Sequence, residues 1–391
     1  MNTDLPNSIH FTSKALVLYD STFPHISVRA HLDAVTDKAF KMAMEITLYE
    51  TEHLSPIIPL KERRLSQILP HLTGPYTIGR CSLVLNIPKA YSSKHGSNEK
   101  IGIEIFAPTS NVIGNKLIMQ MRPGYCAGTP LTKQQVQTLH THALDLDRLD
   151  PLESMSILIF SHGMGADPIV YRPLLEELAS HGFVVLNLNH PASSNHAPFS
   201  QEALDGHVFD ELFSNREKGD KAAEKMALTQ VANIGFVVEQ IRTGKLEKLP
   251  EHCGLKSKII LAGHSLGGAS SILASRGNPE IAGCIDLDGR LEGSAETRST
   301  GLSVPVLVLC SEPETQGKEE VEMAQDFKAF SDNSSPSLYT QKMISGVRHN
   351  DFTMHPMLEW LVGGTNFNGG LKAHTIASQE ILSFMKAIDK Q

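Results

Sequence analysis

One short stretch, residues 257–275, constrains the fold of this chain more than any other. An apolar run at residues 259–262 leads into Gly-His-Ser-Leu-Gly-Gly, and small and apolar residues then follow at helical spacing. This order predicts a strand, a sharp turn and a helix, with Ser265 at the apex of a G-x-S-x-G motif. The apex is crowded, so the positions two residues away must be small, and Gly263 and Gly267 satisfy this need. We therefore expect Ser265 to be a nucleophile; the alternative is an ordinary glycine-rich turn.

The rest of the chain alternates between strand-like and helix-like segments, which predicts an α/β architecture with a mostly parallel sheet. Strands are expected at residues 15–19, 81–87, 101–107, 156–160, 183–189, 259–262, 281–287, 304–309 and 339–344. Helices are expected at residues 37–50, 133–144, 171–180, 221–243 and 377–388. The carboxyl ends of parallel strands share one edge of a sheet, so side chains that follow different strands can meet there.

The charge and cysteine content exclude several function classes. With 43 acidic against 35 basic residues and no Lys/Arg-rich block, the 391-residue chain is not expected to bind nucleic acid. The five cysteines are odd in number and form no C-x-x-C pair, which favours free thiols in a reducing compartment. No group of histidines or carboxylates has the spacing of a metal site, so neither a metal nor another cofactor is expected.

The N-terminal twenty residues have no basic start followed by an apolar core, so no signal peptide is predicted. No apolar run approaches the ~18 residues that a membrane span needs. A cytoplasmic location is therefore expected, with export without a cleaved signal left open.

A serine hydroxyl needs a base that takes its proton, and the base needs an acid that orients it. In this architecture the acid and then the histidine follow the serine in the chain, each after a strand. The expected base is His349, in the loop after the last predicted strand. His355 lies six residues further on and is less well placed, and the side chain of His264 is expected to point away from the serine.

The acid has three candidates. Asp286 and Asp288 lie at the end of one predicted strand, on the same face because side chains alternate, and Glu312 ends the next strand. Asp288 has a short side chain close to the expected site edge, whereas Glu312 precedes a polar turn with a proline, so Asp288 is preferred. Asp286 is expected to be a structural hydrogen-bond acceptor.

Two backbone N–H groups are needed to stabilise the oxyanion that such a reaction forms. One is expected from Leu266, the residue after the serine, and the other from Met164 in the Ser-His-Gly-Met-Gly loop after an earlier strand. His162 in the same loop is expected to hold the loop in place rather than to act as a second base.

Five segments of the chain, taken together, form a specific set. They read FSHGMG from residue 160, ELASHGFVVLNLNHP from 177, GHSLGGAS from 263, IAGCIDLDG from 281 and KMISGVRHNDF from 342. In order and spacing they resemble the platelet-activating factor acetylhydrolase family of α/β-hydrolases. The resemblance runs from about residue 74 to the C-terminal helix. The expected division is an N-terminal segment of uncertain structure, residues 1–73, and an α/β-hydrolase catalytic domain, residues 74–391.

The resemblance implies an α/β-hydrolase fold, in which a mostly parallel central sheet flanked by helices carries a nucleophile elbow. It implies Ser265 as the nucleophile, Asp288 as the acid and His349 as the base. Met164 and Leu266 match the family's oxyanion donors. Members of the family hydrolyse ester bonds without calcium and favour phospholipids with short or oxidised sn-2 chains. A small-molecule or lipid ester is therefore the expected substrate.

The chain departs from the family pattern just after Asp288. Apolar and aromatic residues of the family are replaced there by Gly-Arg-Leu-Glu-Gly, residues 289–293, which places charge where an acyl chain would need apolar cover. The family's membrane-binding surface helices have no clear apolar counterpart, so any association with membrane surfaces is expected to be weak. A broad carboxylesterase or a polyester-type hydrolase is the alternative enzyme. A hydrolase-fold protein that only binds a ligand is the alternative of another class, and the oligomeric state is left open.

Overall fold

A ten-stranded sheet forms the centre of Leu60–Gln391, the larger of the two compact units of the chain. Its strands are β5 (Ile78–Asn86), β6 (Lys100–Pro108), β7 (Asn115–Ile118), β8 (His140–Asp145), β9 (Ile157–Ser161), β10 (Val184–Asn189), β11 (Ile259–His264), β12 (Ile281–Leu287), β13 (Val306–Ser311) and β14 (Tyr339–Ile344). The strands lie in the order β14-β13-β12-β11-β9-β10-β6-β5-β8-β7. All neighbours from β14 to β10 are parallel, whereas β6 is antiparallel to both β10 and β5. The expected mostly parallel sheet is confirmed.

The computed structural model describes, within this unit, residues 69–91, 100–110, 115–118, 140–149, 156–200, 216–249, 252–293, 295–313, 318–335, 337–361, 363 and 365–391. In the N-terminal unit, Met1–Pro59, it describes the strands β1 (His10–Thr12), β2 (Ala15–Tyr19), β3 (Ser27–Leu32) and β4 (Met42–Glu45). The domain boundary expected between residues 73 and 74 stays a prediction.

The four N-terminal strands pair antiparallel in chain order. β2 confirms the strand expected at residues 15–19. The helix expected at residues 37–50 is wrong at β4, whose Met-Ala-Met-Glu sequence pairs with β3. These residue types favour helices, but helix propensity is weak and backbone pairing with a neighbouring strand overrides it.

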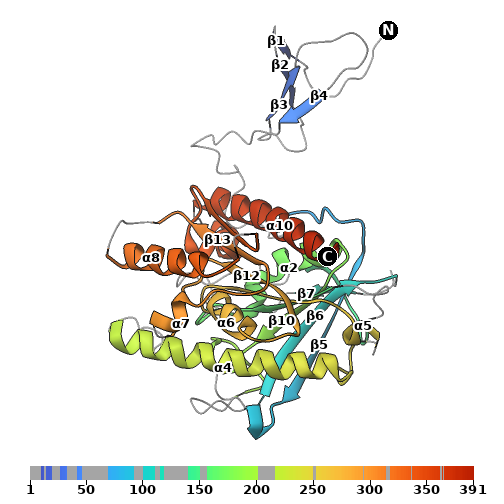
Figure 1. The fold of residues 1–391 in the computed structure, drawn as a ribbon. Coiled ribbons are helices and arrows are strands. Elements are labelled where there is room, and N and C mark those ends of the chain that lie inside the picture. The colour runs from blue at the N-terminus through green and yellow to red at the C-terminus, as the bar shows by residue number, and fades with distance from the viewer. Residues whose placement is uncertain are drawn as a thin grey trace. The chain divides into compact units, whose positions relative to one another are not determined.

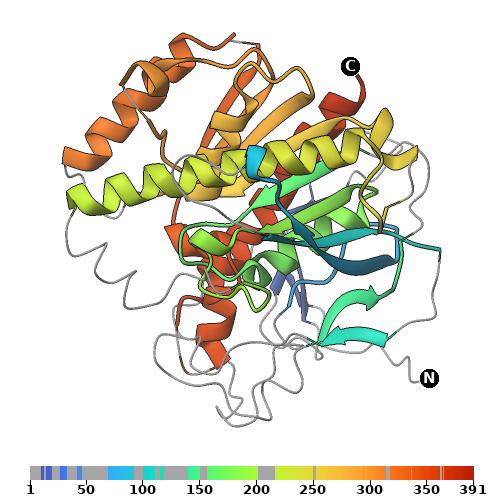
Figure 2. The same ribbon diagram turned by 90° about the horizontal axis from the view of Figure 1, so that it is seen from below.

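Helices cover both faces of the ten-stranded sheet (Figures 1 and 2). They are α2 (Arg172–Ser180), α4 (Arg216–Arg242), α5 (His252–Leu255), α6 (Leu266–Ser275), α7 (Ala295–Ser299), α8 (Lys318–Asp332), α9 (His355–Leu361) and α10 (Phe367–Asp389), with 3₁₀ turns η3 (Lys89–Tyr91), η4 (Pro168–Tyr171), η5 (Pro191–Ser193) and η6 (His349–Phe352). α4 and α6 pack together on one face, and α2 and α10 lie together on the other. The expected α/β fold with flanking helices is confirmed. Within the described residues, no helix has the length and apolar character needed to cross a membrane.

Burial on both faces explains why the central strands have continuous apolar sequences. Ile157 and Ile159 of β9 belong to an apolar cluster with Ile234 and Ile241 of α4. The intervening side chains of β9 point to the opposite face and are buried as well. A strand with helices over both faces needs no polar positions, and this makes its sequence recognisable.

β8 corrects another expectation. The helix expected at residues 133–144 is wrong from residue 140 onward, because His140–Asp145 pairs as a strand with β5 and β7. Residues 133–139 lie outside the described part of the chain. The backbone N–H of His142 also donates to the Glu176 carboxylate of α2 (2.9 Å). Strand partners on both sides satisfy the backbone, which outweighs the helix-favouring residues before it.

A largely buried ion pair fixes α2 to the sheet. Glu104 of β6 accepts hydrogen bonds from Arg172 of α2 (2.5 Å) and from Arg80 of β5 (2.6 Å). The side chains of Arg172 and Glu104 are only 8% and 15% exposed. Burial alone would raise the pKa of Glu104, but the two guanidinium groups bring it down to about 2. The carboxylate is therefore charged at neutral pH.

Replacing Glu104 with glutamine is expected to destabilise the protein by about 3 kcal/mol, because the buried Arg172 would lose the carboxylate of its ion pair. Urea unfolding of Glu104→Gln beside the wild type measures this. Glu280→Gln is the matched control, since Glu280 is 48% exposed in its pair with Arg242. An exposed pair contributes less than about 1 kcal/mol. Equal small changes in both variants would contradict the role given to Glu104.

Candidate active site

The turn between β11 and α6 has the geometry that the G-x-S-x-G motif predicts. Ser265 has φ 55° and ψ −123°, a conformation that side chains rarely adopt and that stores strain. Its N–H donates to the Leu287 carbonyl of β12 (2.9 Å), which holds the apex against the neighbouring strand. A Cβ on Gly267 would lie 2.0 Å from the Ser161 carbonyl oxygen, and one on Gly263 would lie 2.2 Å from the Gly267 carbonyl carbon. Both glycines are therefore required by the close approach of the backbone.

Asp288 and His349 meet beside this turn. His349 lies in η6, after β14, and its Nδ1 donates to Asp288 Oδ2 (2.6 Å). Asp288 directly follows β12 and, like Ser265, has φ 55°. Its carboxylate also accepts the Ser311 N–H (2.7 Å, on Oδ1) and the Ser311 O–H (2.7 Å, on Oδ2) from the end of β13. The structure thus brings together two of the predicted site residues from separate strand ends.

Hydrogen bonding keeps the Asp288 carboxyl ionised, although only 10% of its side chain is exposed to solvent. Burial by itself would raise the pKa of its carboxyl. The hydrogen bond and charge of His349, followed by the two hydrogen bonds from Ser311, outweigh burial and lower the pKa below its ordinary value. An ionised carboxylate accepts at both oxygens, so His349 carries a proton on Nδ1, and in the neutral imidazole the lone pair lies on Nε2.

The other two acid candidates bind elsewhere. Asp286 is fully buried, and its Oδ1 accepts the Gly289 N–H (2.9 Å). Burial raises the pKa of Asp286 well above its ordinary value, which fits a neutral structural group. Glu312 accepts the Gly346 N–H (2.6 Å) and the Ser345 O–H (3.2 Å) in the turn before the histidine. Among the described contacts, only Asp288 gives His349 a carboxylate partner.

Of the other histidines considered as bases, His264 is buried and His355 is half-buried. His355 lies at the start of α9, and burial lowers its pKa to about 4. The ring of His264 lies 4.6 Å from that of His349, centroid to centroid, and both of its nitrogens have hydrogen-bond partners within the protein. Neither residue has the exposed position of His349, whose side chain is 48% exposed.

The loop after β9 has one N–H group without a protein acceptor among the described residues. The N–H of Gly163 donates to the Tyr171 hydroxyl (3.1 Å), and the N–H of Gly165 donates to the Ser193 carbonyl (2.7 Å). Between them lies Met164, whose N–H takes part in none of the hydrogen bonds within the described residues. Leu266 is the first residue of α6, where helix N–H groups have no intrahelical acceptor. Within the described part of the chain, neither expected oxyanion donor has its N–H bound to another protein group.

A buried polar network supports this loop from behind, and most of its members were not predicted from the sequence. His162 donates from Nδ1 to the Gly163 carbonyl (2.8 Å), and its Nε2 accepts the His190 N–H (3.1 Å). Gln230 of α4 donates to the His162 carbonyl (3.2 Å), and Asn233 donates to His190 Nδ1 (3.1 Å). Burial lowers the pKa of His162 to about 4, so the ring is neutral and suits the expected structural role.

The signal for Gln230 and Asn233 was present in α4. They share one helix face with apolar residues such as Ile234, and a polar side chain on a buried face needs a partner. Pattern alone could not name that partner, because His190 is 43 residues away in the chain.

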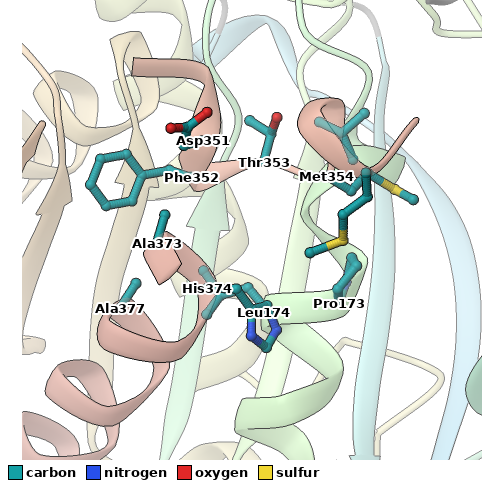
Figure 3. Close-up of a pocket in the computed structure, with 11 residues that line it drawn as sticks. Pro173, Leu174, Asp351, Phe352, Thr353, Met354, Ala373, His374 and Ala377 are labelled. Carbon is teal, nitrogen blue, oxygen red and sulfur yellow. The ribbon is translucent and has the colours of Figure 1, made fainter. Parts of the chain in front are cut away.

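A small cavity lies beneath η6 (Figure 3). Val170, Leu174, Phe352, Met354 and His374 are among its lining residues. It has room for about one water molecule, so it is not a substrate pocket. Within the described residues, no three His, Cys, Asp or Glu side chains are grouped so as to hold a metal ion.

A family model now gives these residues a context. The model of "Platelet-activating factor acetylhydrolase, isoform II" matches residues 119–359, which is 241 of the 391 residues of the chain. The match includes Met164, Ser265, Leu266, Asp288 and His349. The chain belongs to this family. The resemblance carried by the five sequence segments is thereby confirmed.

Curated platelet-activating factor acetylhydrolases are similar to part of the chain. The protein of Cavia porcellus is 25% identical over a match that covers 31% of this chain and 31% of that protein. The protein of Canis lupus familiaris is 28% identical over 31% of this chain and 32% of that protein. The match thus spans about a third of the length of these relatives.

A solved structure shows the same fold over a longer range. The ferulic acid esterase of Streptomyces cinnamoneus superposes with a TM-score of 0.61 and covers 82% of this chain and 92% of its own. The two sequences are 19% identical. The likeness confirms the α/β-hydrolase architecture of this member of the platelet-activating factor acetylhydrolase, isoform II, family.

Proposed function

We propose that this protein is a serine hydrolase that cleaves carboxylic esters through an acyl-enzyme intermediate. Ser265 is the nucleophile, His349 the general base and Asp288 the acid that orients it. The observation that carries the proposal is the 2.6 Å hydrogen bond from His349 to Asp288, next to the strained turn of Ser265. Family membership supports the same assignment. The backbone N–H groups of Met164 and Leu266 are the oxyanion donors.

The chemistry follows from the proton positions. His349 Nε2 takes the proton of the Ser265 hydroxyl while Oγ attacks the ester carbonyl, and Asp288 stabilises the resulting imidazolium. The carbonyl oxygen becomes an oxyanion that accepts hydrogen bonds from Met164 and Leu266. As the intermediate collapses, His349 gives its proton to the leaving alcohol. A water molecule then hydrolyses the acyl-Ser265 ester by the same steps and restores the free enzyme.

The substrate we infer is a small or lipid ester with a short acyl chain. Arg290 and Glu292 follow the acid directly, in place of an apolar wall. Burial, with Asp220 and Glu224 nearby, raises the pKa of Glu292 to about 7 against the opposing effect of Arg290 and Arg298. This side of the site is therefore polar and partly charged at neutral pH, which suits a head group better than a long chain.

A series of p-nitrophenyl esters of increasing acyl length, run beside a short-chain phosphatidylcholine, tests the proposal. Each methylene that enters an apolar pocket is worth about 0.8 kcal/mol, or roughly fourfold in kcat/KM. We expect kcat/KM to stop rising after the first few methylenes. Excess EDTA serves as a control and should leave the rate unchanged, because no step of the mechanism uses a metal. A steady rise to long chains would indicate a deep apolar channel, and hydrolysis without any preference would indicate a broad carboxylesterase.

A cytoplasmic location, weak contact with membrane surfaces and the absence of nucleic acid partners stay predictions.

A further inference from the structure

Two buried side chains connect the loop that carries Met164 with the loop that carries His349. Tyr171 ends η4, and His264 is the last residue of β11, immediately before Ser265. The Gly163 N–H donates to the Tyr171 hydroxyl (3.1 Å), and this hydroxyl lies 2.9 Å from His264 Nδ1. On the other side of the ring, His264 Nε2 lies 2.9 Å from the carbonyl oxygen of His349. Three hydrogen bonds therefore form one chain from Gly163 to His349.

The direction of each bond in this chain is determined by the groups present. A carbonyl oxygen can only accept, so His264 must carry its proton on Nε2. A neutral imidazole then has a lone pair on Nδ1, and the Tyr171 hydroxyl must donate to it. The hydroxyl oxygen remains free to accept the Gly163 N–H. With a neutral His264, all three bonds can exist together only in its Nε2–H tautomer.

The surroundings of His264 favour that neutral form. His264 is 3% exposed and Tyr171 is 1% exposed. Burial, then the neighbouring His349, lowers the pKa of His264 to about 3, against the opposing effect of Asp288. The ring is packed between those of Tyr171 (5.7 Å), His349 (4.6 Å) and Phe352 (6.0 Å), centroid to centroid. Its two hydrogen-bond partners, the Tyr171 hydroxyl and the His349 carbonyl, are both neutral groups.

We propose that Tyr171 and His264 are positioning residues that couple the oxyanion loop to the general base. The Tyr171–His264 relay, as we call these two side chains, fixes Gly163, the neighbour of Met164, and the backbone of His349 relative to the same turn that carries Ser265. The inference rests on the proposed function. The relay explains why a histidine occupies the second position of the Gly-His-Ser-Leu-Gly motif. Its ring hydrogen-bonds to the Tyr171 hydroxyl on one side and to the His349 carbonyl on the other, and takes no part in the reaction itself.

Tyr171→Phe tests the relay with a single-atom change. The ring and its packing against Phe160 (4.9 Å) are kept, and only the hydroxyl between Gly163 and His264 is lost. We expect kcat for a short p-nitrophenyl ester to fall roughly 10- to 100-fold with little change in KM, because the reacting groups are misplaced and substrate binding is not removed. Tyr339→Phe is the matched control. Its ring also packs on a phenylalanine and its hydroxyl also donates a hydrogen bond, but it lies at the opposite end of the sheet from the site.

His264 is tested by two replacements and a double-variant cycle. His264→Gln keeps an N–H that can reach the His349 carbonyl, whereas His264→Leu keeps none, so the glutamine variant should retain more of kcat. Adding Tyr171→Phe to His264→Leu should produce little further loss, because both changes break one chain of bonds. Equal losses in the two His264 variants, or losses that multiply in the double variant, would overturn the relay.

Nitrogen-15 spectra of the histidine rings provide a readout that does not depend on turnover. His264 should be protonated on Nε2 alone, and its signals should shift in Tyr171→Phe but not in Tyr339→Phe. If the wild type is active and Tyr171→Phe keeps the full kcat, the relay is overturned and the proposed function stands. A wild type that neither hydrolyses esters nor reacts with a fluorophosphonate would overturn the proposed function, and the catalytic coupling with it.

Discussion

Ser265→Ala is expected to lower kcat for ester hydrolysis on the order of 10³-fold or more, since no acyl-enzyme can form without the hydroxyl. The fold should be kept, because alanine is smaller than serine and the turn is held by backbone contacts such as the bond from the residue 265 N–H to Leu287. Steady-state kinetics with p-nitrophenyl butyrate measure the loss, and the melting temperature reports the fold.

Covalent labelling separates the nucleophile from other serines. A fluorophosphonate should modify wild-type protein at Ser265 and leave Ser265→Ala unlabelled, as read by peptide mass spectrometry. Ser270→Ala is a suitable control: Ser270 is a buried serine of α6, the helix that follows Ser265, and its hydroxyl donates to the Leu266 carbonyl (2.7 Å). Normal labelling of Ser265→Ala, or loss of labelling in Ser270→Ala, would overturn the assignment.

Asp288→Asn is expected to reduce kcat on the order of 10⁴-fold, because an amide can present its NH₂ to His349 and stabilise the wrong tautomer. The bond that would be disrupted is the 2.6 Å contact between Asp288 Oδ2 and His349 Nδ1. Glu312→Gln should reduce kcat less than about tenfold. Glu312 holds the turn at Gly346 and Ser345, and a glutamine oxygen can still accept those two hydrogen bonds.

The two variants are best compared at neutral pH with the same ester and with circular dichroism as a check on folding. The pair is informative because the two residues directly follow neighbouring strands, β12 and β13, and both were candidates on sequence grounds. If Glu312→Gln loses most of its activity while Asp288→Asn stays active, Glu312 and not Asp288 is the acid that orients His349.

The helices and strands around the site could be predicted where the hydrophobic pattern and the residues that begin or end an element indicate the same boundaries. β12 begins and ends where the apolar run of residues 281–287 predicts. α4 begins at Arg216, five residues before the prediction, because its first turns are polar and carry no apolar stripe. α10 begins at Phe367 rather than residue 377. Gly369 and Gly370 disfavour helix in isolation, and packing against α9 compensates for this.

The candidate site was predictable to the extent that its residues lie in short, recognisable segments. Ser265, Asp288 and His349 each follow a strand, and strand ends of a parallel sheet converge. Tyr171 carries no such signal, since a tyrosine at the end of a helical turn is most simply interpreted as core packing. Its partner His264 is 93 residues away, and only the folded chain shows that they touch. Long-range polar contacts of this kind depend on side-chain direction, which periodicity does not specify.

The backbone at Ser265, with φ 55° and ψ −123°, has a consequence for directed evolution. A glycine would adopt this conformation without the roughly 1–3 kcal/mol of strain that a side chain incurs there. Variant libraries selected for thermal stability alone would thus enrich glycine at position 265, and every variant with this glycine would lack the nucleophile. Engineering this protein for higher thermal stability therefore requires that each round of selection measure turnover as well as melting temperature.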